Sequence, residues 1–241
     1  MIVAAPDTQL HVREAGTGRP LVLVHGGTGT GSFDWGPLIP RLAEHFRVVW
    51  FDLRGHGHSP APGLRLGIVR FGLDTHRVMQ ALGIPRALLV GFSAGANSLL
   101  TLTIRHPRVA AGLVTIGGSM TSDPARVKEI LSGPWPEDLR AIDHVAGGGP
   151  DHWRALRRAL AEDWAANNVF SREMLARITC PFLAIHGERD RIVFPEQAEL
   201  LSRHVPNGSM WLAPDAGHLV QKAAPAETAK RIVEFAGRIS W

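Results

Sequence analysis

Cysteine, lysine and long apolar runs are all scarce in this sequence of 241 residues. The scarcity of cysteine excludes an internal disulfide, and the lack of long apolar runs excludes a membrane span. The single cysteine, Cys180, cannot form an internal disulfide. It precedes Pro181 at the start of an apolar run, which favours a buried structural thiol over a reactive one. No apolar run approaches the ~20 residues of a membrane span, and the N-terminus lacks the basic and apolar regions of a signal peptide. We therefore expect a cytoplasmic protein without a membrane partner.

Clustered positive charge is also absent. The 26 basic residues, of which only three are lysines, are interleaved with 22 acidic residues, and the net charge is +4. No run of five or more Lys or Arg occurs. We therefore expect a solvated surface of mixed charge and no nucleic-acid partner.

The rest of the composition is that of an ordinary globular protein. Hydrophobic residues make up 45% of the chain and charged residues 20%. A chain of this length predicts one large domain, or one domain with an insertion, and it can bury a sizeable core.

Strand and helix patterns alternate along most of the chain. Residues 1–15 predict an edge hairpin around Pro6-Asp7, and 21–24 is a continuous apolar run typical of a buried parallel strand. The further predicted strands are 46–51, 87–90, 110–116, 181–185 and 208–212, and the predicted helices between them are 36–44, 68–82, 96–105, 195–204 and 225–239. This alternation predicts an α/β fold with a mainly parallel central sheet flanked by helices.

The alternation breaks between the core segments 1–117 and 178–241. Residues 118–177 show helix patterns with Gly and Pro breaks (123–132, 137–146, 150–166 and 171–177), which predicts a short helical cap, or lid, over the carboxyl end of a strand. The segment contains Trp135, Trp153 and Trp164. These three side chains could line a substrate pocket, although packing the cap on the body is the expected role for at least two of them.

The stretch Gly91-Phe92-Ser93-Ala94-Gly95 lies between a predicted strand and a predicted helix and reads G-x-S-x-G. Strand, tight turn and helix are the context of a nucleophile elbow, which presents its serine hydroxyl at the tip of the turn. A Cβ at 91 or 95 would collide with the neighbouring strand or helix. Because short patterns of this kind also occur by chance, the rest of the chain must supply the partners of Ser93.

A serine nucleophile needs a base, and the base needs a group that fixes its tautomer. His218 follows the last predicted strand and Asp190 follows the strand before it. Functional loops of an open α/β sheet gather at the carboxyl ends of its strands, where these residues fall. Glu188, Asp215 and Asp123 are rival candidates for the acid.

An acyl-transfer site also needs an oxyanion hole made of two backbone N–H donors. Ala94 follows the serine at a helix N-terminus and should supply one donor. Gly27, in the Gly-rich loop after strand 21–24, should supply the other.

The chain resembles the α/β-hydrolase superfamily, in particular its small-lid esterase, lactonase and haloperoxidase-like members. Five motifs in the same order carry the resemblance over nearly the whole chain: His-Gly-Gly at 25–27, Asp-x-Arg-Gly-His-Gly-x-Ser at 52–59, Gly-Phe-Ser-Ala-Gly at 91–95, Gly-x-x-Asp-x-Ile-Val at 187–193 and Gly-His at 217–218. The resemblance implies Ser93 as nucleophile, His218 as base, Asp190 as orienting acid, and Gly27 and Ala94 as oxyanion donors.

Two further loops carry polar residues for which the resemblance implies structural roles. It implies that His25 orders the oxyanion loop by hydrogen bonding. Asp52, His56 and His58 have metal-ligand side chains, but the resemblance makes their loop a structural turn, so we expect no metal. The loop at 26–31 lacks the lysine and spacing of a phosphate-binding loop, and we expect no cofactor.

The sequence therefore predicts a serine hydrolase that acts on a small-molecule acyl substrate, a carboxylic ester or a lactone. A serine at 93 argues against the chemistries that use a carboxylate nucleophile in this fold. Thioester or carbon–carbon bond hydrolysis remains open because both use the same triad, as does a ligand-binding member of the fold with little turnover.

Overall fold

The computed structural model describes the chain except residues 28, 124, 126, 128, 130–148 and 168. The strands are β1 (Ile2–Ala5), β2 (Thr8–Ala15), β3 (Pro20–Val24), β4 (Arg47–Phe51), β5 (Ala87–Phe92), β6 (Ala110–Ile116), β7 (Phe182–Gly187) and β8 (Gly208–Ala213). The helices are α1 (Gly31–Trp35), α2 (Ile39–Leu42), α3 (Ile68–Ala81), α4 (Ala94–Arg105), α7 (Gly149–Asn167), α8 (Arg172–Leu175), α9 (Glu196–His204), α10 (Val220–Ala223), α11 (Pro225–Ala236) and the short 3-10 helices η1 (Pro62–Leu64) and η2 (Pro107–Val109).

The strands of the described residues form one eight-stranded sheet in the order β1-β2-β4-β3-β5-β6-β7-β8. The pairs β1–β2 and β2–β4 are antiparallel, which confirms the edge hairpin, and all later pairs are parallel. The strand order reverses between β3 and β5, because the chain builds outward from β3 on one side and from β5 on the other. Such a switch point opens a crevice at the carboxyl ends of the two strands, where α/β proteins bind ligands.

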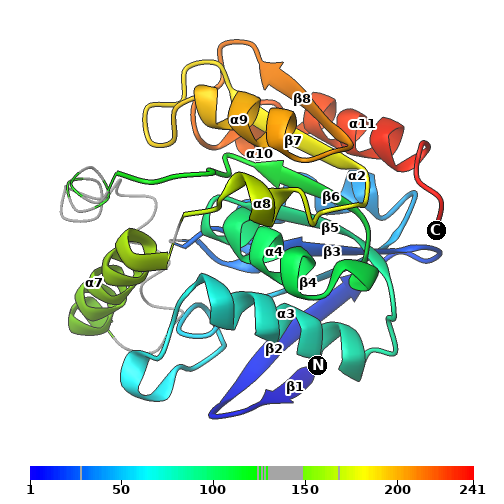
Figure 1. Cartoon of the computed structure of the whole chain (residues 1–241). Coiled ribbons are helices and arrows are strands. Elements are labelled where there is room, and N and C mark those ends of the chain that lie inside the picture. Colours follow the sequence, from blue (N-terminus) through cyan, green and yellow to red (C-terminus); the bar gives the residue numbers. More distant parts are fainter. Residues whose placement is uncertain (28, 124, 126, 128, 130–148, 168) are drawn as a thin grey trace.

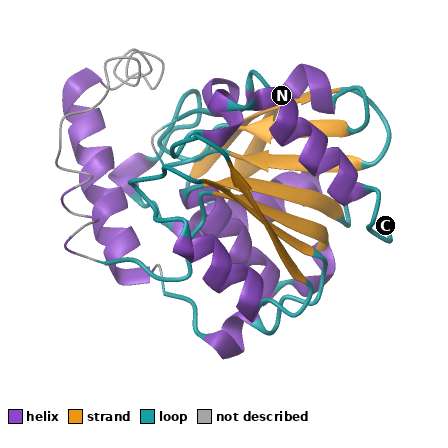
Figure 2. Ribbon diagram, turned by 90° about the horizontal axis from the view of Figure 1, so that it is seen from above, coloured by secondary structure: helices purple, strands orange, loops and turns teal. Residues whose placement is uncertain are grey.

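Side chains of the central strands alternate between two hydrophobic cores, one on each face of the sheet. Val22 and Leu89 point into the core that α3, α4 and α9 cover, whereas Leu21 and Leu88 point into the core under α1, α2, α10 and α11. All four side chains are fully buried. Burial on both faces explains why these strands are continuously apolar rather than alternating with polar residues. Figure 2 shows the helices on the two faces of the sheet, so the predicted α/β fold is confirmed.

The helix predicted at 36–44 is wrong in its bounds. The structure has two short helices there, α1 and α2, separated by Gly36-Pro37-Leu38. The first begins earlier than predicted because Thr30 caps it, its Oγ1 accepting the N–H of Phe33 at 3.2 Å. A proline after Gly36 interrupts the helical hydrogen bonds and ends the first helix.

Between β6 and β7 the described elements are helical. α7 contacts η1 and the start of α3, and Figure 1 shows it beside the segment that follows β4. The side chain of Asp163 on α7 accepts the N–H of Ile68 at 2.8 Å and so caps α3. The end of the predicted cap is packed on the body, since Phe170 and Leu175 belong to the core beside α4 and α9.

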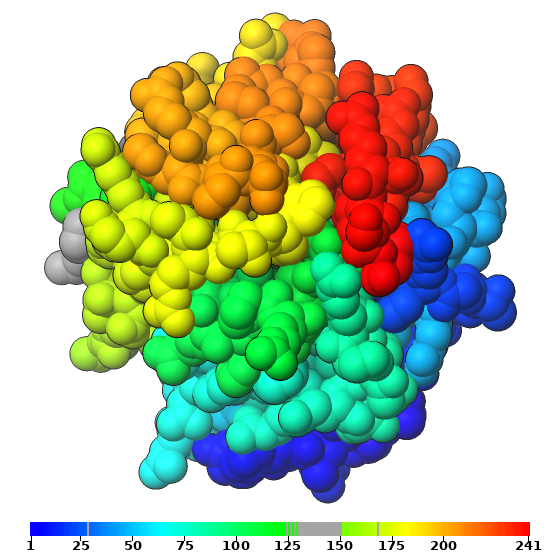
Figure 3. All heavy atoms as spheres, turned by 45° about the vertical axis from the view of Figure 1, so that its right-hand side comes forward, coloured from blue at the N-terminus to red at the C-terminus, as the bar shows by residue number. Residues whose placement is uncertain are grey.

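The chain end is packed on the body. The guanidinium carbon of Arg19 lies over Trp241, 5.3 Å from the centroid of the indole ring. The ring centroids of Trp241 and Phe46 are 6.4 Å apart. Figure 3 shows this red C-terminal segment between the orange β8 region and the blue N-terminal strands. Of the helices in the described part of the chain, not one combines the length and the apolar character that crossing a membrane demands.

Candidate active site

Ser93 lies in the turn between β5 and α4 in a backbone conformation that is rare for a serine. Its φ is 50° and its ψ −118°, and its N–H donates to the carbonyl of Ile116 on β6 at 2.8 Å. A positive φ outside glycine costs energy and persists only where the surroundings enforce it. A Cβ on Gly91 would lie 2.7 Å from the backbone of Ala96, and one on Gly95 would overlap the carbonyls that end β3. The two glycines therefore allow the sharp turn, as the sequence predicts.

His218 and Asp190 come together from the loops after β8 and β7. His218 Nδ1 lies 2.7 Å from Asp190 Oδ2, and the imidazole ring lies 4.9 Å from the ring of Phe92, the residue before Ser93. Gly117, after β6, makes room for this ring, because a Cβ there would lie 2.9 Å from His218 Cε1. An Asp acceptor at Nδ1 leaves Nε2 free to accept a proton, which is the tautomer that a serine nucleophile needs.

Asp190 is held as a carboxylate. Its Oδ1 accepts the N–H groups of Ile192 and Val193 at 2.9 and 3.0 Å. Burial works to raise its pKa, but the hydrogen bonds from His186 and His218 outweigh burial and lower the pKa below its usual range. Asp190 therefore stays charged and can stabilise an imidazolium at His218.

His186 is a partner of Asp190 that the sequence did not single out. Its side chain is 1% exposed, and its Nε2 lies 3.2 Å from Asp190 Oδ2 and 2.8 Å from the carbonyl of Val193. The signal was available, because a histidine that ends a buried strand must find a hydrogen-bond partner.

The rival acids lie elsewhere. Glu188 and Asp215 are exposed, and Asp215 pairs with Arg189. Asp123 lines a cavity farther along the sheet edge. Among these carboxylates the structure places Asp190 at His218.

Gly27 and Ala94 are neighbours at the crevice between β3 and β5. A Cβ on Gly27 would lie 3.3 Å from the Cβ of Ala94 and 3.6 Å from Leu160 Cδ1 on α7. The two predicted oxyanion donors are thus brought together, with the cap helix directly over them.

Three buried side chains hold the loop that carries Gly27. His25 accepts the N–H of Leu53 at Nε2 (2.8 Å), so its Nδ1 donates to the carbonyl of Gly26 at 2.6 Å. His56 Nε2 lies 3.0 Å from the carbonyl of Gly27. Burial lowers the pKa of His25 to about 3, which keeps this imidazole neutral.

Asp34 is the third of these side chains. Its Oδ2 accepts the N–H of Gly26 at 2.9 Å, and burial raises its pKa to about 7. No local pattern marked Asp34, which lies eight positions after Gly26. The bond of His56 to Gly27 needed the fold, because 29 positions separate the two residues.

A cavity of about 230 Å³ lies beside the Asp190 loop. The residues that line it come from the segment after β6, from α7 and from the loop before α9, and they are Ser119, Thr121, Ser122, Asp123, Val127, Trp164, Ile192, Val193, Phe194 and Gln197. Of the three tryptophans proposed for a substrate pocket, Trp164 lines this cavity. Trp153 is buried in the core under α7, and Trp135 lies outside the described residues.

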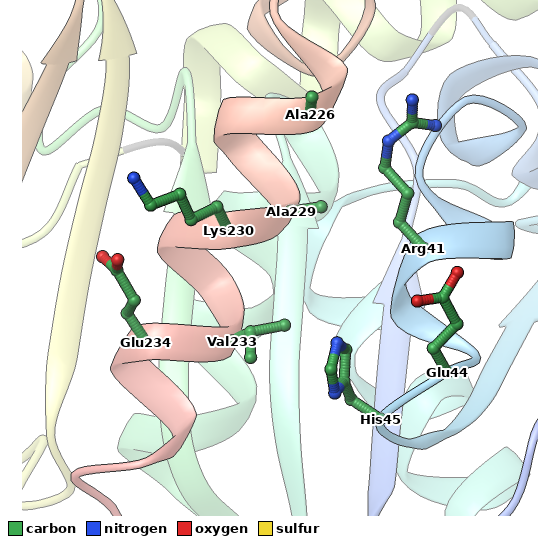
Figure 4. Close-up of a pocket in the computed structure, with 8 residues that line it drawn as sticks. All are labelled: Arg41, Glu44, His45, Ala226, Ala229, Lys230, Val233 and Glu234. Atoms are coloured by element: carbon green, nitrogen blue, oxygen red, sulfur yellow. The ribbon is translucent and has the colours of Figure 1, made fainter.

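A second depression, of about 280 Å³, lies on another surface. Figure 4 shows it as a groove between α11 and the region of α2, with Arg41 on one side and Lys230 on the other. Its remaining lining residues are Glu44, His45, Ala226, Ala229, Val233 and Glu234. None of the candidate site residues contributes to this groove.

Comparisons with known proteins agree with this geometry. A human serine hydrolase, BPHL, is 28% identical over 234 residues, which cover 90% of this chain and 79% of the relative. The 2-hydroxy-6-oxo-6-(2'-aminophenyl)hexa-2,4-dienoic acid hydrolase of Metapseudomonas resinovorans is 23% identical over 98% of this chain and 90% of its own length. The solved structure of Est816, an N-acyl homoserine lactone degrading enzyme, superposes with a TM-score of 0.82 at 22% identity and covers 98% of this chain and 100% of its own.

A family model connects the fold, the elbow and these relatives. The model of the alpha/beta hydrolase fold matches residues 19–143, more than half of the chain, from the start of β3 through the elbow and beyond β6. The sheet order and the switch point at β3 and β5 agree with that match. The chain belongs to the α/β-hydrolase fold family.

Proposed function

We propose that this α/β-fold hydrolase is a serine hydrolase that cleaves carboxylic esters or lactones through an acyl-enzyme on Ser93. One observation carries the proposal: the strained serine of the elbow follows Phe92, whose ring lies 4.9 Å from the imidazole of His218, and His218 Nδ1 lies 2.7 Å from the buried carboxylate of Asp190. Serine, histidine and aspartate in this relation activate a hydroxyl for attack on a carbonyl.

The reaction begins with Ser93. His218 Nε2 takes the hydroxyl proton as Oγ attacks the substrate carbonyl, and the carbonyl oxygen acquires negative charge. The N–H groups of Gly27 and Ala94 stabilise that oxyanion, assisted by the N-terminus of α4. The charge of Asp190 stabilises the imidazolium that forms.

The intermediate then collapses. His218 gives its proton to the leaving alcohol, or to the ring oxygen of a lactone, and the acyl group remains on Ser93. A water molecule, deprotonated by the same imidazole, attacks the acyl-enzyme and releases the acid by the reverse sequence.

The cavity beside Asp190 supports an uncharged acyl substrate. Its described lining combines apolar side chains with hydroxyls and one carboxylate, Asp123, and contains no Lys, Arg or His. Among the described residues that line this cavity, none offers a cation to a substrate that bears a carboxylate. The proposed substrate therefore differs from that of the dienoic acid hydrolase, whose named substrate is a keto acid without an ester bond.

Carbon–carbon bond hydrolysis is the second candidate because that relative spans nearly the whole chain. The same triad serves both reactions, so only the substrate separates them. A panel of p-nitrophenyl esters and lactones of graded chain length, together with a ring-fission dienoate, tests the choice. Turnover of the dienoate without turnover of any ester or lactone would replace the proposal.

The nucleophile is tested by Ser93→Ala, with Ser202→Ala on α9 as the matched control. We expect kcat/KM for p-nitrophenyl acetate to fall by several orders of magnitude in the first variant and to stay unchanged in the second. A fluorophosphonate probe should label the wild type and the control only. Full turnover in Ser93→Ala, or labelling that persists, would contradict the assignment.

A further inference from the structure

Two histidines and an aspartate converge outside the active site, where β2 runs beside the loop after β4. One donor atom from each of His11, Asp52 and His58 lies within 4.8 Å of the other two. His58 Nδ1 is 3.2 Å and His11 Nδ1 3.9 Å from the same oxygen, Oδ2 of Asp52. The sequence grouped Asp52 and His58 with His56. The fold instead turns His56 toward Gly27 and brings His11 into the cluster.

Backbone hydrogen bonds fix the frame of this cluster. The N–H of His11 donates to Ser59 Oγ at 2.9 Å, and the N–H of Asp52 donates to the carbonyl of His11 at 3.1 Å. The second oxygen of Asp52, Oδ1, accepts the N–H of Gly31 at 3.0 Å. Asp52 Oδ2 accepts the N–H of His58 at 3.1 Å, so these bonds hold the strand and the loop together at the three donors.

One donor in the cluster is unsatisfied. His11 Nδ1 is buried, and within the described part of the chain no group hydrogen-bonds to it. A buried polar nitrogen without a partner is costly, and native structures usually supply one. The His58 side chain is 50% exposed, so the cluster is open to solvent on that side and an ion can reach it.

We propose that His11, Asp52 and His58 form a binding site for a divalent transition-metal ion of the zinc class. Two imidazoles and a carboxylate are donors that Zn²⁺ takes, with water in the fourth position of a tetrahedron. Bonds of roughly 2.0–2.2 Å place the donors on one ion about 3–4 Å apart. The donors now lie within 4.8 Å of one another, and a small rotation of the half-exposed His58 side chain brings them to the spacing that one ion needs.

The site has a structural consequence for the neighbouring loop. Asp52 precedes Leu53, whose N–H holds His25, and the same loop carries His56, which contacts the carbonyl of Gly27. An ion on Asp52 clamps this loop to β2. Metal binding therefore stabilises the folded chain, since a ligand that binds only the native state raises the unfolding midpoint.

The experiment uses the whole chain without an affinity tag, freed of metal by a chelator. Zn²⁺ is titrated by calorimetry, and thermal unfolding is followed with and without the ion. We expect one strong site in the wild type and a raised unfolding temperature. His58→Ala and His11→Ala should weaken zinc binding at least about tenfold and abolish the rise in temperature. Co²⁺ loaded at the site should give a visible d–d absorption that both variants lose.

Two controls separate this site from others on the surface. His45→Ala removes an exposed imidazole outside the cluster and should leave zinc binding unchanged. His106→Ala breaks another close imidazole pair, with His76, whose ring centroids lie 4.6 Å apart. A zinc affinity that survives both cluster variants, or that falls in His106→Ala instead, overturns the proposal. So does the absence of any heat or stabilisation on adding Zn²⁺ to the wild type, and circular dichroism of each variant excludes misfolding as the cause of a loss.

Discussion

The loops that carry Ser93, Asp190 and His218, called here the floor of the site, and the cap helix α7 are held in place in different ways. Ser93, Asp190 and His218 follow the parallel strands β5, β7 and β8. Backbone hydrogen bonds to the sheet fix the first two of these loops: the N–H of Ser93 donates to the carbonyl of Ile116 and that of Asp190 to the carbonyl of Gly187. The floor is therefore continuous with the most buried part of the molecule.

The cap helix α7 is attached through side chains. Asp163 bonds to the start of α3, His152 Nε2 lies 3.3 Å from the carbonyl of Gly55, and Leu160 rests on Gly27. Its ion pair Arg158–Glu162 is exposed on both partners and adds little stability. The difference teaches that the sheet fixes the positions of the candidate catalytic residues, whereas α7 is an element that can change without disturbing the sheet.

The largest expected effect comes from a substitution of Asp190 in the floor of the site. In Asp190→Asn the amide donates to His218 Nδ1, so Nε2 carries the proton and cannot accept that of Ser93. We expect kcat for p-nitrophenyl acetate to fall by about 10⁴-fold, as in other triads, with the unfolding temperature little changed.

Asp215→Asn is the matched control, because Asp215 is a nearby exposed carboxylate paired with Arg189. Its activity should stay within about twofold of the wild type, since an exposed pair contributes little. Equal losses in the two variants would show that Asp190 has no special relation to His218.

A pair of Leu→Ala substitutions compares the floor with the cap directly. Leu89 lies in the middle of β5 and is fully buried, so Leu89→Ala should lower the free energy of unfolding by about 2–5 kcal/mol. Leu160→Ala should cost less in global unfolding, because α7 can undock before the sheet unfolds. It should instead raise KM for a long-chain ester by up to about tenfold.

Chemical denaturation and steady-state kinetics on both variants measure the contrast. The same loss of unfolding free energy in the two variants would mean that cap and floor unfold as one cooperative unit, and the contrast between them would then be wrong.

The smallest effect concerns pH and the loop beside Gly27. Burial raises the folded-state pKa of Asp34 from 3.8 to about 7, so between these values the folded chain holds a proton that the unfolded chain has lost. The stability that this proton contributes is present below pH 4 and is lost as the pH rises through 7. Asp34→Asn removes the titration and keeps an acceptor for the N–H of Gly26.

Unfolding temperatures of the wild type and Asp34→Asn, measured from pH 5 to pH 8, test this sign. The free energy of unfolding of the variant should gain on that of the wild type as the pH rises from 5 to 8, by about 2–3 kcal/mol. A constant difference across the range would show that Asp34 is already ionised in the folded chain at pH 5.

Local patterns predicted much of the site's framework. The elbow glycines and the strand ends that carry Asp190 and His218 follow from short stretches, because a parallel sheet brings the ends of successive strands to one edge. The helix at 36–44 failed because Thr30 and Pro37 set the helix ends through local hydrogen bonds that the apolar spacing did not show. The roles of Asp34 and His56 depend on burial and on contacts across the fold, which a sequence pattern does not contain.

The sequence by itself determined the α/β order of elements, the strained turn at Ser93 and the set of candidate partners, since each depends on local spacing and on which residues a turn tolerates. The resemblance pointed to Asp190 as the partner of His218, and the structure places it there. Only the tertiary structure decided that Leu160 covers Gly27 and that His11 joins Asp52 and His58. These are encounters between positions far apart in the chain. Their partners are selected by the packing of the whole sheet and its helices, where a shift of a few ångströms decides which group bonds to which.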